Sequence, residues 1–287
     1  MNVYSLITDP SNPLPLTEHG YNQKTKRLAP YVQTINGIVK AFALCPACKN
    51  PVILVNRTIP DTEAVIMYAK HTGYDVQGLA KHVEAEYLDC DLANPARFDS
   101  KARRTSAKRN NEIRDAMLNH FDLVIQQLEQ AIGIKFTDNV IEAMVRDFAG
   151  NRGYEYQAIT LFNLPFGFAY MTEAKDLYGC KVSAEVAKDI EAGSQGFTVK
   201  KYFDIYTVER KKPSPSGTGL RLYFNRHGVG ELPGKDSIQM VVVETNSVVD
   251  QSTELYKATI EFDGAKFYNF YRRKERLRQI AEAQLGR

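Results

Sequence analysis

Residues 38–55 read IVKAFALCPACKNPVILV, and this stretch decides how the first part of the chain folds. Two β-prone runs, one ending at Leu44 and the other beginning at Val52, flank a short turn, which predicts a β-hairpin. The turn holds Cys45 and Cys48 with two residues between them. This spacing lets both thiolates reach one tetrahedral ion from the tip of the hairpin, as in a zinc knuckle.

A cysteine pair supplies half of a closed zinc site, so further ligands have to come from elsewhere in the chain. A strand predicted from residue 64 ends at His71, and a helix predicted from residue 73 ends at Cys90, with His82 inside that helix. We predict a structural Zn²⁺ site made of Cys45, Cys48, His71 and Cys90. His82 is the substitute for one of these ligands.

Two other interpretations of the cysteine pair are open. In the first interpretation, Cys45 and Cys48 are ordinary buried residues of a turn. The second is a thioredoxin-like redox role, which the absence of a βαβ frame around the motif disfavours. Cys180 stands alone at a predicted turn, where a structural role is expected.

Composition and targeting signals narrow the class of protein. With 44% hydrophobic and 25% charged residues, the chain is not of the disordered, collagen-like or disulfide-scaffold class. Residues 1–15 lack a basic segment followed by an apolar one, so we expect no signal peptide and a cytoplasmic, reducing location. The longest apolar stretch, residues 158–171, is too short to span a bilayer and predicts a buried strand or core segment.

The pattern along the chain predicts an α+β fold in three segments. Residues 1–96 form a zinc-binding module with an irregular lead-in over residues 1–36. Residues 97–153 hold a basic segment and a helical hairpin, with one helix over 113–132 and a second capped by Thr137 or Asp138.

Residues 154–287 are predicted to form an antiparallel sheet with flanking helices. Residues 156–162 are β-prone, residues 183–191 are a helix candidate, and Asp263-Gly264 is a turn candidate. We expect strands at 197–208, 220–225, 238–244 and 255–262, a returning strand at 265–270, and a closing helix at 271–285.

The cysteine region resembles the N-terminal zinc module of bacterial competence proteins of the CoiA type. The resemblance covers roughly residues 40–90 and consists of Cys45-Pro46-x-Cys48, the strand over 52–55 and later histidines. Those proteins carry a His-Phe-x-His element where this chain has Lys70-His71-Thr72. The resemblance implies a metal module in a bacterial DNA-handling or antiviral defence setting.

The formal net charge of +3 hides a strong segregation of charge. Residues 97–114 hold seven Lys and Arg against two acidic residues, and residues 266–278 hold six against one. Each stretch therefore carries +5, and the remainder of the chain carries −7. Two basic patches of this kind favour phosphate-bearing partners.

The basic patch at 266–278 mixes aromatic rings with cations, a combination that single-stranded nucleic acid favours. The alternative is a core strand followed by the solvated face of a helix. A solvated linker is the alternative at 97–114, and either patch could hold a protein partner or a nucleotide. The nucleic-acid-binding candidates are Arg103, Arg104, Lys108, Arg109, Tyr268, Tyr271, Arg272, Arg273, Lys274 and Arg276.

Two places are candidates for catalysis. His227 follows a predicted strand and enters a glycine-rich loop with Glu231 nearby, where a general base could lie. Asp204 and Glu209 resemble the carboxylates of restriction-type nucleases, although their spacing on one predicted strand points them to opposite faces.

These observations lead to one main hypothesis and two alternatives. We expect a cytosolic, zinc-containing protein that associates with DNA or RNA, as an effector or accessory of a bacterial defence or mobile-element system. A nuclease or nucleotide-directed hydrolase acting through the C-terminal part is the first alternative. The second is a subunit that binds an acidic protein partner; no membrane partner is expected.

Overall fold

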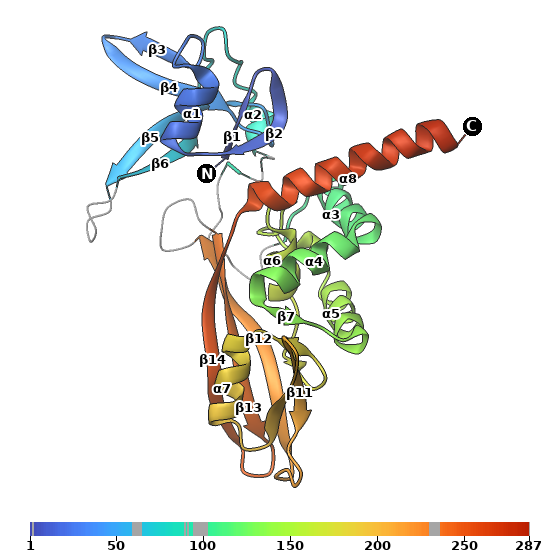
Figure 1. Cartoon of the computed structure of the whole chain (residues 1–287). Helices are drawn as coiled ribbons and strands as arrows, with labels where there is room; N and C mark the ends of the chain where they lie inside the picture. The colour runs from blue at the N-terminus through green and yellow to red at the C-terminus, as the bar shows by residue number, and fades with distance from the viewer. Residues whose placement is uncertain are drawn as a thin grey trace. The chain divides into compact units, whose positions relative to one another are not determined.

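The protein is described by a computed structural model that covers residues 1, 3–58, 65–88, 90, 92–93, 103–229 and 236–286 (Figure 1). It contains helices and antiparallel sheets, so the predicted α+β class is confirmed. The chain forms two compact units. The first unit comprises Met1–Asp99, Val229–Lys235 and Asp263–Arg287, and the second comprises Ser100–Gly228 and Asp236–Phe262. The predicted segments 97–153 and 154–287 thus largely share the second unit, while the C-terminal residues belong to the first.

An antiparallel sheet with the strand order β2-β1-β4-β5-β6 forms the centre of the first unit, and β3 pairs with β4. Its strands are β1 (Val3–Leu6), β2 (Asp9–Pro15), β3 (Val32–Ile35), β4 (Ile38–Leu44), β5 (Pro51–Thr58) and β6 (Val65–His71).

The irregular lead-in expected over residues 1–36 is wrong, because these residues form β1, β2, β3 and helix α1 (Glu18–Thr25). The prolines of β2 are the reason why no strand was predicted there. Proline lacks the N–H that a central strand needs, but β2 lies at the edge of the sheet, where proline is tolerated. Thr17 starts α1 by accepting a hydrogen bond from the backbone N–H of Gly20 at 3.0 Å.

The hairpin predicted around the cysteine pair is confirmed. Leu44 at the end of β4 lies opposite Pro51 at the start of β5, with Cys45 to Asn50 as the connection. The strand predicted to end at His71 is also confirmed as β6. Val52 of β5 pairs with His71, so the sheet brings the end of β6 beside the cysteine turn.

The helix predicted to open at residue 73 is wrong over most of its length, because only α2 (Glu84–Leu88) is helical. Gly78 has a φ of +74°, a left-handed conformation that interrupts a helix and suits glycine. Val76 and Leu79 are buried against Phe42 and Leu44 of β4. Packing against the sheet therefore explains the apolar spacing that predicted a helical face.

Helix α8 (Gly264–Leu285) replaces both the strand expected at 265–270 and the helix expected from 271. Asp263 caps it by accepting hydrogen bonds from the backbone N–H groups of Ala265 and Lys266. The predicted turn at Asp263-Gly264 is in fact the start of this helix. The side chain of Asn269 donates to the carbonyl of Pro13 at 3.2 Å, which ties α8 to β2 within the first unit.

The second unit begins with helices. A single helix predicted over 113–132 is wrong, since α3 (Ala107–Asn119) and α4 (Phe121–Ile132) are separated by the buried residue His120, whose φ of −138° is not helical. Gly133 ends α4 in the left-handed conformation, and Thr137 caps α5 (Asp138–Gly150), as predicted.

The apolar stretch after α5 forms turns and a buried helix instead of the β structure expected at 156–162. Asn163 accepts a hydrogen bond from the backbone N–H of Thr160 and donates to the carbonyl of Ala158, which holds a tight turn. Pro165 lies in the first turn of the helix that follows, a position that suits proline. The elements here are η1 (Gly153–Glu155) and α6 (Leu164–Tyr170).

Two four-stranded antiparallel sheets complete the second unit, in the orders β10-β11-β9-β7 and β14-β13-β12-β8. The predicted strands at 220–225, 238–244 and 255–262 and the helix at 183–191 are confirmed. The elements are β7 (Ile134–Lys135), β8 (Lys175–Asp176), β9 (Lys181–Val182), α7 (Ala184–Gly193), β10 (Phe197–Tyr202), β11 (Ile205–Arg210), β12 (Thr218–Val229), β13 (Asp236–Asn246) and β14 (Gln251–Phe262).

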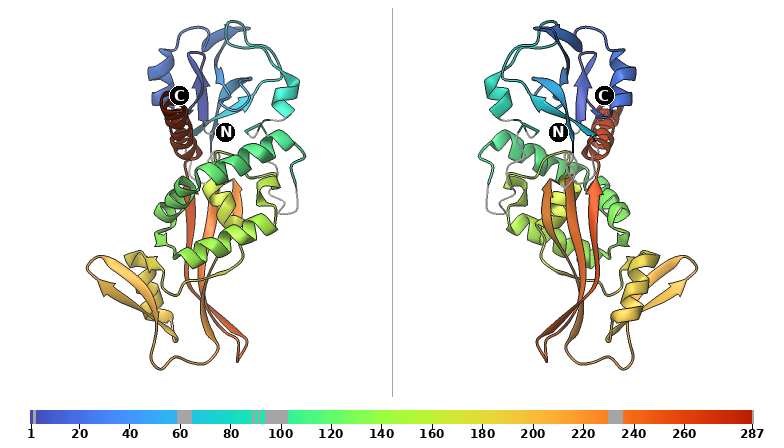
Figure 2. Two further views of the ribbon diagram at one scale, coloured as in Figure 1. Left: turned by 90° about the vertical axis from the view of Figure 1, so that its right-hand side faces the viewer. Right: turned by 90° about the vertical axis from the view of Figure 1, so that its left-hand side faces the viewer.

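The single strand expected at 197–208 is instead the β10–β11 hairpin, which Figure 2 shows beside α7. Phe203 has a φ of 51° and turns the chain together with Asp204. Tyr202 pairs with Ile205 at the end of the ladder. Within the described residues, no helix is both long and apolar enough to cross a membrane.

Asp147 of α5 is a carboxylate whose contribution to stability can be tested. It accepts hydrogen bonds from the Lys175 ammonium and from the backbone N–H of Glu173, at 2.8 Å for the latter. Burial raises the pKa of Asp147, but these hydrogen bonds outweigh burial, so its pKa lies below the usual value. Its contribution to stability is therefore fully present above the usual carboxyl pKa of about 4 and is lost as the pH falls from there through the lowered pKa.

We expect Asp147→Asn to lower the free energy of unfolding by about 2 kcal/mol at pH 7, measured by urea denaturation, since hydrogen bonds to a charged group are lost. Glu142→Gln is the matched control, because the Glu142–Arg146 pair on the same helix is 72% exposed at both side chains. Its effect should stay below about 0.5 kcal/mol. Equal losses for the two variants would contradict the assignment.

Candidate metal centre

Three separate parts of the first unit supply the four side chains of the predicted metal site. Cys45 directly follows β4, Cys48 lies in the turn, His71 ends β6 and Cys90 follows α2. The turn is held by hydrogen bonds from the backbone N–H of Cys45 to the carbonyl of Asn50 and from that of Lys49 to the carbonyl of Cys45, both at 2.9 Å. The hairpin therefore fixes two ligands, and strand pairing brings the third.

The ligand atoms converge as a tetrahedral site requires. The three cysteine Sγ atoms and a ring nitrogen of His71 all lie within 4.8 Å of one another. The Sγ atoms of Cys45 and Cys90 are 3.6 Å apart, and Nε2 of His71 lies 3.3 Å from Sγ of Cys48 and 3.7 Å from Sγ of Cys90. With metal–ligand bonds of about 2.0–2.3 Å, the edges of a tetrahedron are about 3.5–3.8 Å long. This cluster could hold a metal ion, as predicted.

The cluster is enclosed in the core of the first unit. Cys45 is fully buried, Cys48 and Cys90 are less than 10% exposed, and all three pack in the cluster that includes Tyr4 and Val52. No disulfide joins them; all are free thiols. Burial of this kind suits a closed structural site, because a catalytic metal needs a position open to substrate or water.

Crowding of three thiols produces opposed pKa shifts. Burial raises the pKa of Cys45 well above the usual range, whereas hydrogen bonds from Cys45 and Cys90 lower the pKa of Cys48 strongly. The hydrogen bond with Cys45 lowers the pKa of Cys90, but the hydrogen bond with Cys48 and burial outweigh it and raise this pKa to about 12. One thiolate is thus favoured beside two thiols, and a bound cation would allow the others to lose their protons.

Asn50 positions the segment that leads to the fourth ligand, a role that was not predicted from the sequence. Its buried amide accepts from the backbone N–H of Val83 at 2.6 Å and donates to the carbonyl of the same residue at 3.2 Å. This two-point contact fastens residue 83 to the cysteine turn immediately before α2. Asn50 stands two residues after Cys48, and that position was the only available clue.

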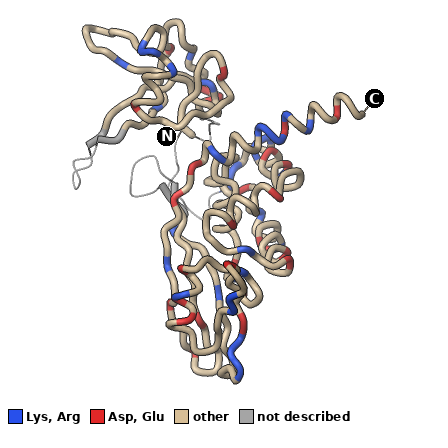
Figure 3. The backbone as a smooth tube through the Cα atoms, viewed as in Figure 1, with Lys and Arg blue, Asp and Glu red and all other residues tan. Residues whose placement is uncertain are grey.

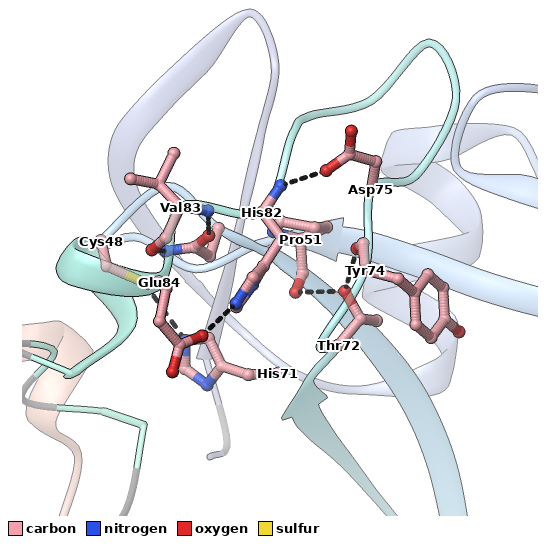
Figure 4. A network of polar contacts seen from close by, with 10 residues as sticks. Cys48, Pro51, His71, Thr72, Tyr74, Asp75, His82, Val83 and Glu84 are labelled. Carbon is pink, nitrogen blue, oxygen red and sulfur yellow. Dashed lines mark hydrogen bonds and ion pairs between the residues drawn. The ribbon is translucent and has the colours of Figure 1, made fainter.

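His82, the predicted substitute ligand, does not belong to the cluster of four (Figure 4). Its Nε2 lies 2.8 Å from a carboxylate oxygen of Glu84, and its backbone N–H donates to the side chain of Asp75 at 2.8 Å. The ring of Tyr87 packs between the two histidines, with centroids 5.4 Å from His71 and 5.7 Å from His82. Cys180 lies in the second unit, apart from the cluster.

The basic residues predicted at 97–114 are largely engaged within the second unit. Arg104 donates to the carbonyls of Gln157, at 3.3 Å, and of Ile159. Arg103 lies over the ring of Tyr156 at 5.9 Å. Arg109 forms an ion pair with Glu112 at 2.8 Å, and Lys108 is exposed. Arg97 and Lys101 lie outside the described residues.

The candidates at 266–278 all lie on α8. Arg272, Arg273 and Arg276 are exposed, and none of them forms an ion pair with a described residue. Lys274 is partly exposed, and the rings of Tyr268 and Tyr271 are 6.4 Å apart on the same helix. Figure 3 shows the basic positions gathered in the first part of α8.

The catalytic candidates are not brought together in the part of the chain that the structure describes. Glu209 lies in β11, where an oxygen of its carboxylate is 4.0 Å from Nζ of Lys200, and it belongs to no described cluster of metal-ligating groups. Asp204 lies in the turn, so the prediction that both residues share one strand is wrong. His227 lies in β12 and not in a loop, and Glu231 lies outside the described residues.

Comparisons with protein-family models, curated proteins and solved structures found no match for this chain. The function is therefore inferred from the site itself.

We expect purified protein to contain about one metal ion per chain, measured by inductively coupled plasma mass spectrometry, and Cys45→Ser to abolish it because three ligands hold the ion poorly. The melting temperature should fall in parallel, since metal binding contributes to folding.

His82→Gln and Cys180→Ala are the matched controls, because neither residue belongs to the cluster, and both should retain the metal. A folded wild-type protein without metal would contradict the assignment, as would a metal content that depends on His82.

Proposed function

We propose that the cluster of Cys45, Cys48, His71 and Cys90 holds a structural Zn²⁺ ion. A set of three thiolates and one imidazole is among the ligand sets typical of structural zinc, and softer ligands of this kind disfavour magnesium and calcium. The four ligands would complete a tetrahedron and leave no open position. The ion would then stabilise the first unit and would not activate a water molecule.

We propose further that the protein associates with nucleic acid through α8. The observation that carries this proposal is the exposure of Arg272, Arg273 and Arg276 without an ion pair to a described residue. Guanidinium groups left unpaired on a surface can neutralise phosphates and release counterions. Helix α8 belongs to the same unit as the metal cluster, so the proposed zinc ion would support the binding surface.

The stretch 103–114 supports nucleic-acid binding less well, because Arg103, Arg104 and Arg109 already contact a ring, backbone carbonyls and a carboxylate of the second unit. Moving such an arginine to a phosphate would break an existing contact, which offsets part of the gain. We therefore assign the main contact to α8. A role as effector or accessory of a bacterial defence or mobile-element system rests on the resemblance of residues 40–90 to competence proteins.

Binding of a fluorescein-labelled single-stranded 20-mer, measured by anisotropy between 50 and 300 mM salt, tests the proposal. Affinity should fall steeply with salt, since released counterions drive binding. The double variant Arg272→Gln/Arg273→Gln should weaken binding by at least about tenfold at low salt and reduce the logarithmic salt slope by about 1.4, the value for two lost contacts on a single strand.

Arg146→Gln serves as the control, because this exposed arginine of α5 changes the net charge without altering α8. It should leave both affinity and slope nearly unchanged. Binding that is independent of salt would contradict the proposal. So would equal affinity for a poly-glutamate peptide of the same length, which would instead indicate an acidic protein partner.

A further inference from the structure

A polar cleft lies between α8 and the edge strand β2, within the first unit. Its volume is about 510 Å³, and residues of both elements line it. Those used in the argument are Arg272, Arg273, Arg276 and Asn269 of α8 and Asp9 and Asn12 of β2. A cleft of this size is within the range of small-ligand sites, about 300–1,000 Å³, and can receive one nucleotide but not a duplex.

The α8 side of the cleft forms a cationic wall, because its arginines lie on one face of the helix. Arg272 and Arg273 lie three and four residues after Asn269, and Arg276 lies four and three residues after them, so all four share one face of the helix. Side chains four residues apart start about 6 Å from each other. Long arginine side chains on such a face can therefore converge on a single phosphate with parallel N–H donors.

The arginines of this wall are available for a ligand. Another residue that lines the cleft, Glu275, pairs with Arg278 at 3.2 Å. No described residue forms an ion pair with Arg272, Arg273 or Arg276. The three guanidinium groups repel one another, and a phosphate would offset this repulsion.

The opposite wall of the cleft, formed by β2, carries no cation among its lining residues but an acid and an amide. Asp9 and Asn12 offer a carboxylate and an amide, which can accept from and donate to the hydroxyls of a ribose or the edge of a base. A carboxylate disfavours a ligand that is anionic throughout, such as sulfate or a phosphate-rich membrane surface. A ligand with an anionic end and a neutral hydrogen-bonding end fits both walls.

Both walls are held in place. The amide of Asn269, which lines the cleft, donates to the carbonyl of Pro13 in β2 at 3.2 Å. Lys49, directly after the cysteine turn, donates to the carbonyl of Pro10 in β2 at 2.8 Å and to that of Pro46 in the turn. The strand that forms the second wall is thus anchored to the helix and to the loop of the metal cluster.

From this arrangement we propose that the cleft between α8 and β2 binds one nucleoside phosphate unit, with the phosphate on Arg272, Arg273 and Arg276 and the sugar or base on Asp9 and Asn12. The proposal rests on nucleic-acid association through α8 and specifies the unit that is recognised. This unit is either a free nucleotide or one nucleotide of a single strand.

Isothermal titration calorimetry on the metal-loaded full-length protein tests the proposal with three probes: adenosine 5′-monophosphate, adenosine and inorganic phosphate. The monophosphate should bind at least about tenfold more tightly than either of the others, because only it reaches both walls. Arg272→Gln/Arg276→Gln should weaken its binding at least about tenfold, whereas Lys266→Gln, an exposed position of the same helix outside the cleft, should not.

Asn12→Ala separates the two walls. It should weaken the binding of the monophosphate by about three- to tenfold, through loss of one or two hydrogen bonds, and leave that of phosphate unchanged. Phosphate that binds as tightly as the monophosphate would overturn the proposal, as would a monophosphate affinity unaffected by both the arginine and the Asn12 variants. Retention of the native melting temperature in each variant shows that folding is intact.

Single strands distinguish the two sources of the nucleotide. Displacement of a labelled 20-mer by adenosine 5′-monophosphate would place one nucleotide of the strand in the cleft, and tight monophosphate binding without displacement would indicate a free nucleotide. If the strand binds in an Arg272-dependent way and the monophosphate does not bind, the cleft proposal is wrong while association through α8 stands. If the strand does not bind at all, association itself is wrong.

Discussion

Three sulfur atoms and one imidazole nitrogen meet in the core of the first unit, and the arrangement of that unit depends on this convergence. Buried thiols at separations of 3.6 Å cannot all ionise without a cation, as the opposed pKa shifts of Cys45 and Cys48 indicate. The hairpin, the end of β6 and the segment after α2 have to meet at one point.

The same constraint extends to the proposed binding surface. A hydrogen bond from Lys49 fixes the cysteine turn to β2, and a hydrogen bond from Asn269 fixes α8 to β2. Two hydrogen-bonded links therefore connect a metal-ligand loop with a basic helix more than 200 residues later in the chain. In this way a structural metal ion would contribute to recognition without touching the ligand.

Charge alone does not show which basic residues are available to a partner. The stretches 97–114 and 266–278 carry the same net charge, and in the sequence only the aromatic rings interleaved with its cations favour 266–278. Arg104 and Arg109 are engaged with carbonyls and a carboxylate of the second unit, whereas Arg272 and Arg276 have no described ionic partner. The difference arises from packing, because α3 lies beside η1 and α4, while α8 contacts β2.

The sequence by itself determined the local features: the hairpin around Cys45 and Cys48, the caps at Gly133 and Thr137, the α+β class and the four residues of the metal cluster. The hairpin and the caps depend on spacing or on the conformation of one residue, which neighbouring residues reveal, and the cluster depends on the few cysteines and histidines of residues 45–90. Only the tertiary structure decided that residues 73–83 are not helical, that the proline-rich β2 is an edge strand, and that α8 begins at residue 264. Those outcomes depend on which surface each segment packs against, and the partners lie far away in the sequence.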